Sequence, residues 1–224
     1  DWLVDDCDFW IVTRDRDLGS DTQYDGISTT EWVPVEGAMV RYLAPDQLSI
    51  AAIAALIHAT PHDLVHLNSF FDPVFSIKVL LARRLGKLPA RPLVLSPRGE
   101  FVDGPLRLKY PKKITYITLS KLAGFYRGIT WHASSVLEME GFIKVMKIDT
   151  DAIKVALDLP SKVNLETPAS KLFSDNWLRI VFLSRLTREK NLDYALRTLK
   201  KVKANVVFDI FGPDEDAAYW DECQ

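Results

Sequence analysis

Short runs of β-branched and aromatic residues alternate with longer helical patterns along most of this chain. Such alternation is typical of strand–helix–strand units, which place their strands side by side in a parallel sheet. The runs predict strands at 7–13, 38–43, 64–67, 93–95, 129–132 and 153–156, and helices at 45–59, 73–85, 106–123 and 135–147. The fold class expected for this part of the chain is therefore α/β with a parallel sheet.

A change of composition marks a boundary between two domains. Residues 159–176 hold prolines, serines and asparagines with few apolar side chains, which is typical of a linker. A second α/β set follows, with strands at 180–183 and 206–211 and helices at 191–201 and up to Gln224. We therefore predict a first domain over 1–158 and the start of a second over 177–224. Two strands leave much of a sheet uncovered, so the second domain is expected to be incomplete.

Composition excludes several classes of function. A net charge of −2 argues against nucleic acid as a partner. The two cysteines, Cys7 and Cys223, form no metal-binding spacing and fit a reducing, cytosolic compartment. No apolar stretch is long enough to span a membrane, and no signal peptide is visible. A cytoplasmic protein is expected, with the inner face of the cytoplasmic membrane as the alternative location.

Two loops that follow predicted strands carry candidate chemistry. Ser184–Asn191 lies between a strand and a helix, where free backbone N–H groups suit an anion, and Arg185 and Lys190 could grip a diphosphate there. Solvated surface cations are the simpler interpretation. In the other loop, Arg98 and Glu100 flank Gly99 at the sheet edge where α/β folds bind ligands. A local arginine–glutamate pair that holds the turn would explain this loop equally well.

Residues 182–199, FLSRLTREKNLDYALRTL, look like the opening of the donor domain in retaining glycosyltransferases of family four. That family has the two-domain GT-B fold, so the resemblance implies a Rossmann-like first domain on the acceptor side. It also implies that Arg185 and Lys190 contact the donor diphosphate. The stretch 97–101 is similar to the PRGEF segment of a bacterial subgroup, where many relatives instead carry histidine-glycine. Arg98 and Glu100 become the catalytic candidates.

Other segments resemble the cleft wall of the same family. His66 and Asn68 end the third-strand segment, and Ser134 precedes the last long helix of the first domain. Together with Gly99 they are predicted to line the cleft, although His66 could be purely structural. Ser135 and Glu138 are explained as a helix cap. No metal is expected, and the Asp15-Arg16-Asp17 triplet is interpreted as an ordinary loop.

The implied reaction moves a sugar from a nucleotide-diphosphate sugar to an acceptor hydroxyl with retention, in the synthesis of a surface polysaccharide or glycan. The co-substrate is the nucleotide sugar, no cofactor is required, and the acceptor is a glycan or a lipid-linked glycan. A basic helix face could make peripheral contact with a membrane, or could simply be solvated. This face is formed by Lys109, Lys112, Lys113 and Lys121 with Tyr110 and Tyr116.

The resemblance also implies that parts of the enzyme lie outside this sequence. The family's first strand with its glycine-rich turn, and its E-x7-E signature, have no counterpart between Asp1 and Gln224. The chain by itself is therefore expected to be inactive. The alternative is a non-catalytic α/β module that binds a glycan or a protein partner. A sugar-nucleotide epimerase would need GxGxxG and Tyr-x-x-x-Lys, and neither is found.

Overall fold

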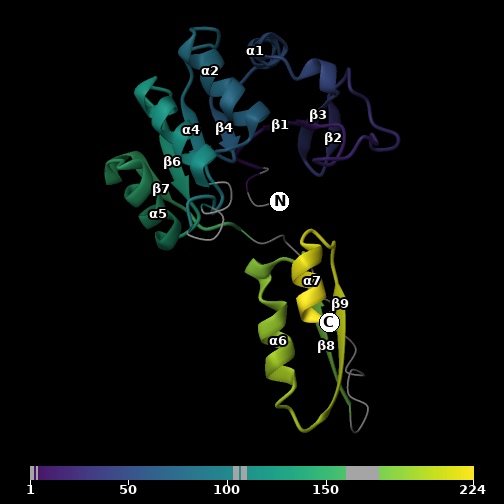
Figure 1. Cartoon of the computed structure of the whole chain (residues 1–224). Coiled ribbons are helices and arrows are strands. Elements are labelled where there is room, and N and C mark those ends of the chain that lie inside the picture. Colours follow the sequence, from purple (N-terminus) through teal and green to yellow (C-terminus); the bar gives the residue numbers. More distant parts are fainter. Residues whose placement is uncertain (1–2, 4, 103–105, 107–109, 160–176) are drawn as a thin grey trace. The chain divides into compact units, whose positions relative to one another are not determined.

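The computed structural model describes Leu3, Leu106 and residues 5–102, 110–159 and 177–224. The chain divides into two compact units, Asp1–Lys162 and Val163–Gln224, whose elements are labelled in Figure 1. The predicted linker at 159–176 lies, apart from Leu159, outside the described residues. None of the helices in the described part of the chain is both long and apolar enough to cross a membrane.

A four-stranded, all-parallel sheet is the centre of the first unit. Its strands, in spatial order, are β4 (Val65–Asn68), β5 (Leu93–Ser96), β6 (Thr130–Ala133) and β7 (Ile153–Val155). This order places consecutive strands side by side, which is the usual arrangement of sequential strands joined by crossover connections. The expected α/β class is confirmed, and the parallel sheet is compatible with a Rossmann-like fold.

The remaining strands of this unit form a second sheet. It contains β1 (Phe9–Arg14), β2 (Val33–Val35) and β3 (Ala38–Leu43), with β3 in the middle. β1 is parallel to β3, whereas the unpredicted β2 is antiparallel to it. The expectation of one sheet through this unit was wrong for the described residues, because no described strand pairs with β1 on one side and β4 on the other.

The helices of the first unit begin largely where the sequence predicts. They are η1 (Pro45–Gln47), α1 (Ile50–Ala59), the π-helix η2 (Pro73–Lys78), α2 (Val79–Arg84), α4 (Tyr110–Leu122), α5 (Val136–Met146) and η3 (Thr150–Ala152). Asp72 caps η2 by accepting hydrogen bonds from the N–H groups of Val74 and Phe75. The helix predicted over 73–85 therefore exists, but its first six residues are π-helical.

The core lies on one face of the four-stranded sheet. Leu67, Leu95 and Trp131 point to this face from three adjacent strands and are at most 4% exposed. Phe70 is fully buried among them, with its ring 4.7 Å from that of Phe101 and 6.1 Å from that of Trp131. Burying a large apolar side chain of this kind contributes about 1.5–3 kcal/mol. Because side chains alternate along a strand, the residues between these project from the opposite face.

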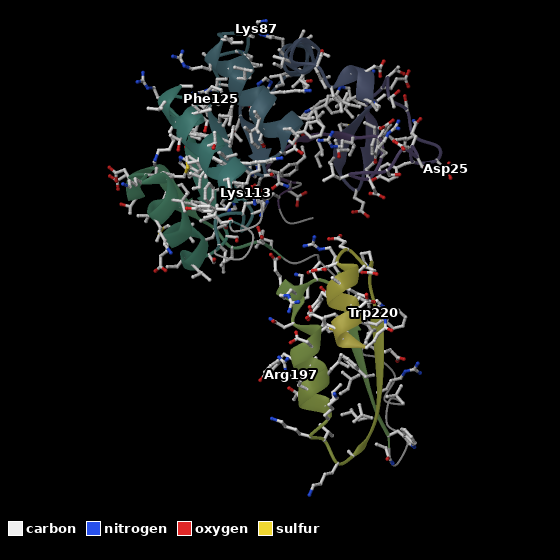
Figure 2. All side chains as sticks on the ribbon, viewed as in Figure 1. Asp25, Lys87, Lys113, Phe125, Arg197 and Trp220 are labelled. Atoms are coloured by element: carbon white, nitrogen blue, oxygen red, sulfur yellow. The ribbon has the colours of Figure 1, made fainter. Side chains whose placement is uncertain are left out.

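The second unit contains two parallel strands and the helices that follow them. These are β8 (Trp177–Leu183), η4 (Arg188–Lys190), α6 (Leu192–Leu199), β9 (Asn205–Phe211) and α7 (Ala217–Cys223). A small core forms around Leu186, Leu192 and Tyr219, and Trp220 packs against it (Figure 2). The Tyr219 hydroxyl donates to Asp193 at 2.6 Å, which joins the two helices.

Candidate functional site

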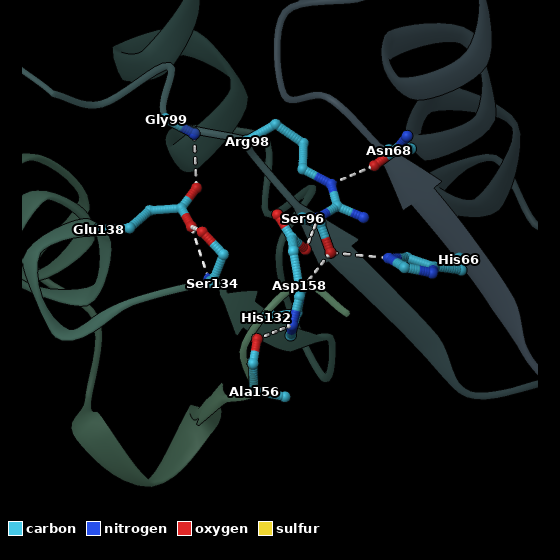
Figure 3. A network of polar contacts seen from close by, with 10 residues as sticks. All are labelled: His66, Asn68, Ser96, Arg98, Gly99, His132, Ser134, Glu138, Ala156 and Asp158. Atoms are coloured by element: carbon cyan, nitrogen blue, oxygen red, sulfur yellow. Dashed lines mark hydrogen bonds and ion pairs between the residues drawn. The ribbon is translucent and has the colours of Figure 1, made fainter. Parts of the chain in front are cut away.

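Polar residues gather at the carboxyl end of the four-stranded sheet (Figure 3). His66 pairs in register with Val94, and Val94 pairs with Thr130. Residues two positions further along each strand lie on the same face, which places Asn68, Ser96 and His132 together there. Parallel strands bring their carboxyl ends to one edge, and open α/β sheets bind ligands at that edge. The fold thus assembles side chains that are far apart in the sequence.

A chain of hydrogen bonds runs across three strands of this face (Figure 3). His66 Nε2 lies 2.7 Å from Ser96 Oγ, which lies 2.8 Å from His132 Nδ1. His132 Nε2 in turn lies 2.9 Å from the carbonyl oxygen of Ala156, just past β7. Ser96 is only 1% exposed, so its hydroxyl depends on the two imidazoles as partners.

The surroundings of His66 favour its uncharged form. Desolvation lowers the pKa of His66, and the positive charge of Arg98 and then the imidazole of His132 lower this pKa further. His66 is nevertheless classed as an exposed residue. The site therefore offers solvent a neutral imidazole that can accept a hydrogen bond at physiological pH.

Arg98 occupies a tight turn directly after β5. Arg98 and Gly99 both have positive φ angles, 54° and 76°, and the N–H of Glu100 donates to the carbonyl of Pro97 at 3.2 Å. Two central residues of positive φ are characteristic of a type I′ turn. For a residue other than glycine, this conformation costs roughly 1–2 kcal/mol. The backbone of Arg98 is therefore strained in this turn.

The guanidinium of Arg98 joins three loops. Its Nε donates to Asn68 Oδ1 at 2.5 Å, and its Nη1 forms an ion pair with Asp158. The side chain of Arg98 remains 37% exposed. Asn68, predicted to line the cleft, thus orients the arginine, and Asp158 is a partner that the sequence did not indicate. The predicted Arg98–Glu100 pair is not the contact that positions this guanidinium.

Glu100 faces the loop that follows β4. Its carboxylate accepts hydrogen bonds from the Ser69 hydroxyl at 2.8 Å, the Phe70 N–H at 2.5 Å and the Phe71 N–H at 3.3 Å. Three donors on one carboxylate are enough to explain why a glutamate stands here. These contacts hold two loops together at the sheet edge, so Glu100 has a structural role.

Glu138 ties the Arg98 turn to helix α5. This carboxylate is 3% exposed and accepts hydrogen bonds from the Gly99 N–H at 2.6 Å, the Ser134 N–H at 2.7 Å and the Ser134 hydroxyl at 2.9 Å. The predicted N-cap is confirmed for Ser135, because Ser135 Oγ accepts from the N–H of Glu138. The Glu138 carboxylate does not complete a capping box, since it accepts from Ser134 and Gly99 and not from the N–H of Ser135. Sequence reasoning explained Glu138 by this cap alone and missed its contact with Gly99.

Arg185 and Lys190 lie in the second unit, in the loop from β8 to α6. Two successive backbone bonds fold this loop, from the Thr187 N–H to the Arg185 carbonyl and from the Lys190 N–H to the Thr187 carbonyl. Arg185 pairs with Glu215 at 3.0 Å, and both side chains are about half exposed. Lys190 is exposed and forms no ion pair with any residue that the structure describes.

The loop after β9 presses against the loop that carries Arg185. Gly212 has a φ of 151°, and a Cβ at this position would lie 1.8 Å from the carbonyl oxygen of Ser184. Only glycine therefore permits this approach. The N–H of Leu186 also donates to the carbonyl of Pro213. As a result, the loop after β9 holds the Arg185 loop in place.

The basic face of α4 is partly engaged within the fold. The ammonium of Lys113, labelled in Figure 2, lies 4.8 Å from the ring centre of Phe71, and Lys121 donates to the carbonyl of Met146. Tyr116 packs against the ring of Phe70. Lys109 lies outside the described residues. These contacts give Lys113, Lys121 and Tyr116 structural partners.

The carboxylates of Asp15 and Asp17 have separate partners. Asp15 is 1% exposed and accepts two hydrogen bonds from the guanidinium of Arg16, at 2.8 and 2.9 Å. Asp17 accepts from the Tyr24 hydroxyl at 2.6 Å. Over the described ranges, no group of three or more histidine, cysteine or acidic residues is arranged to hold a metal ion.

No protein-family model matches the chain, and no curated protein matches its sequence.

Proposed function

We propose that this chain is part of a retaining glycosyltransferase of the GT-B class that uses a nucleotide-diphosphate sugar as its donor. In this assignment, the first unit is the acceptor side and the second begins the donor side. The single observation that carries the proposal is the loop between β8 and α6. It follows a parallel strand, presents Arg185 and Lys190, and leaves both cations exposed.

The chemistry of that loop fits a diphosphate. A planar guanidinium can contact two phosphate oxygens, and a nearby ammonium adds a second positive charge. Arg185 already holds a carboxylate, that of Glu215, which an incoming diphosphate would replace. In a retaining transfer without a metal, these two cations would stabilise the negative charge that develops on the departing diphosphate.

The first unit supports the proposal with a third cation, Arg98, which is held in place before a ligand binds. Asn68 and Asp158 orient the guanidinium of Arg98, and its turn is fixed through Glu138. Groups held in place before the substrate arrives lose little free energy when they bind it. We assign to Arg98 a contact with the substrate, and to Glu100 and Ser134 the positioning of the loops around it. The acceptor would be a glycan or a lipid-linked glycan.

The test is isothermal titration calorimetry of the full-length protein that contains this chain, with UDP-, GDP- and ADP-sugars. One donor class is expected to bind, and Arg185→Ala or Lys190→Ala to weaken that binding by about tenfold to a hundredfold, as lost charge-assisted contacts do. Lys200→Ala is the matched control, since Lys200 is an exposed lysine at the far end of α6. It should leave the affinity unchanged.

Two outcomes would contradict the proposal. One is that no nucleotide sugar binds at any practical concentration. The other is that a nucleotide sugar binds with the same affinity to the wild type and to both loop variants. Either result would favour a non-catalytic module that recognises a glycan or a protein.

A further inference from the structure

The donor and the acceptor of each hydrogen bond in the chain at the sheet edge can be assigned, starting from the carbonyl of Ala156. The carbonyl oxygen of Ala156 can only accept, so His132 Nε2 must carry a hydrogen. In the neutral imidazole, the other ring nitrogen then has a lone pair. His132 Nδ1 is therefore the acceptor of its contact with Ser96 Oγ.

The same reasoning fixes the form of His66. The single hydrogen of the Ser96 hydroxyl is used on His132, so Ser96 Oγ accepts from the ring of His66. His66 is thereby an Nε2–H tautomer, with a lone pair on Nδ1. No described residue forms a hydrogen bond with this Nδ1, and His66 is exposed. The free acceptor of the chain thus belongs to an exposed residue.

We propose that Ser96 and His132 are positioning residues that hold His66 in the Nε2–H tautomer, so that His66 Nδ1 accepts a hydrogen bond from a hydroxyl of the ligand. That the hydroxyl belongs to a sugar acceptor rests on the proposed function. The tautomer assignment follows from the hydrogen-bond geometry alone. The opposite tautomer would present an N–H at this position and would repel a hydroxyl that must donate.

The charged surroundings agree with this role. Desolvation disfavours a charge on His66 most strongly, and Arg98 and then His132 add to this effect. The carboxylate of Asp158 is occupied by the guanidinium of Arg98. A neutral ring keeps its lone pair, whereas an imidazolium would have none. The guanidinium that keeps His66 neutral is also the one assigned to the substrate.

The experiment records the tautomers of all four histidines by long-range ¹H–¹⁵N NMR on the whole chain, at a pH where the rings are neutral. His66, His132 and His58 are expected as Nε2–H forms. His62 is expected as the Nδ1–H form, because its Nδ1 faces the carbonyl of Thr60. His58 and His62 lie outside this chain of hydrogen bonds, so they serve as internal references in every variant.

Replacing His132 separates a positioning role from a merely structural one. In His132→Phe, the buried Ser96 hydroxyl loses its acceptor and should donate to His66 instead, which switches His66 to the Nδ1–H form. In His132→Asn, the amide oxygen can replace Nδ1 as acceptor, and His66 should remain Nε2–H. An Nδ1–H form of His66 in the wild type, or no change in His132→Phe while the two reference rings are native, would overturn the proposal.

The hydroxyl is tested with a panel of methyl glycosides as probes. At least one should shift the ¹⁵N resonance of His66 Nδ1 in the wild type and in His132→Asn, but not in His132→Phe. If no glycoside moves this resonance, the role of His66 as a hydroxyl acceptor is overturned. Neither readout needs a nucleotide sugar, so failure here can be told apart from failure of donor binding.

Discussion

The buried carboxylate of Glu138 accepts a hydrogen bond from the N–H of Gly99 at 2.6 Å, although 39 residues separate the two in the chain. Ser134 donates to the same carboxylate from its N–H and its hydroxyl. Helix α5 is therefore fastened to the turn that presents Arg98. A single side chain couples the stability of the first unit to the geometry of its candidate site.

Removing that carboxylate should destabilise the first unit. Glu138→Ala leaves the N–H groups of Gly99 and Ser134 without a buried partner, and we expect a loss of about 2–4 kcal/mol in the free energy of unfolding. Urea unfolding followed by circular dichroism measures this loss. The control is Glu140→Ala, an exposed glutamate on the same helix, which should change stability by less than about 0.5 kcal/mol. Equal effects of the two changes would refute the contact.

The positive φ of Arg98 predicts an unusual order of stability between two variants. Arg98→Ala and Arg98→Gly both lose the ion pair with Asp158, which is partly exposed. Only the glycine relieves the left-handed backbone, so Arg98→Gly should be more stable than Arg98→Ala by about 1 kcal/mol. Thermal unfolding of the two proteins provides the comparison. An alanine variant at least as stable as the glycine variant would show that the turn is not left-handed.

The lowered pKa of His66 makes stability depend on pH. The unfolded chain protonates His66 near its ordinary pKa of 6.5, whereas the folded chain does so only at lower pH. As pH falls below about 6.5, the unfolded state gains a proton first, so the free energy of unfolding decreases until the folded pKa is reached. Above 6.5 the group contributes no slope. Urea unfolding at several pH values should show this decrease in the wild type.

Two variants check that His66 causes the slope. His66→Asn should remove this contribution, because asparagine does not titrate. Arg98→Gln should reduce it, since loss of the guanidinium charge raises the pKa of His66 towards its ordinary value. An NMR titration of His66 that gives the same pKa with and without the Arg98 charge would contradict this explanation.

The ion pair between Arg185 and Glu215 should compete with a bound diphosphate. Glu215→Gln frees the guanidinium and removes a nearby negative charge, and exposed pairs are worth about 0–1 kcal/mol. We therefore expect donor affinity to rise by roughly twofold to fivefold. Glu222→Gln is the matched control, because Glu222 pairs with Arg188 of the same loop. Calorimetry that finds equal effects for the two changes would separate Arg185 from the donor site.

Local patterns predicted most elements of the fold. The alternation of apolar runs located the strands, and Pro73 and Gly86 bound the helix predicted between them. Two features were missed because they depend on partners distant in the sequence. The short strand β2 is formed by its pairing with β3. The division of the first unit into two sheets depends on which strands pair with one another.

The candidate site was predicted unevenly for the same reason. Arg98 could be singled out because it follows a predicted strand, whereas His66 and Asn68 were indicated by the family resemblance. Ser96 ends an otherwise apolar strand and His132 lies between two buried apolar residues of another, which was a usable but overlooked signal. Asp158 contacts Arg98 and Glu138 contacts Gly99, and these partners are 60 and 39 residues apart in the sequence. No local pattern encodes such pairings.

The most direct test of the proposed function asks where a nucleoside diphosphate binds. Backbone ¹H–¹⁵N spectra of the full-length protein that contains this chain would be recorded during titrations with UDP, GDP and ADP. The proposal predicts that at least one of them shifts the amides of residues 184–191 most strongly, and that Arg185→Ala suppresses these shifts. Shifts confined to other segments, or none with any of the three, would contradict the assignment of this loop to a sugar-nucleotide donor.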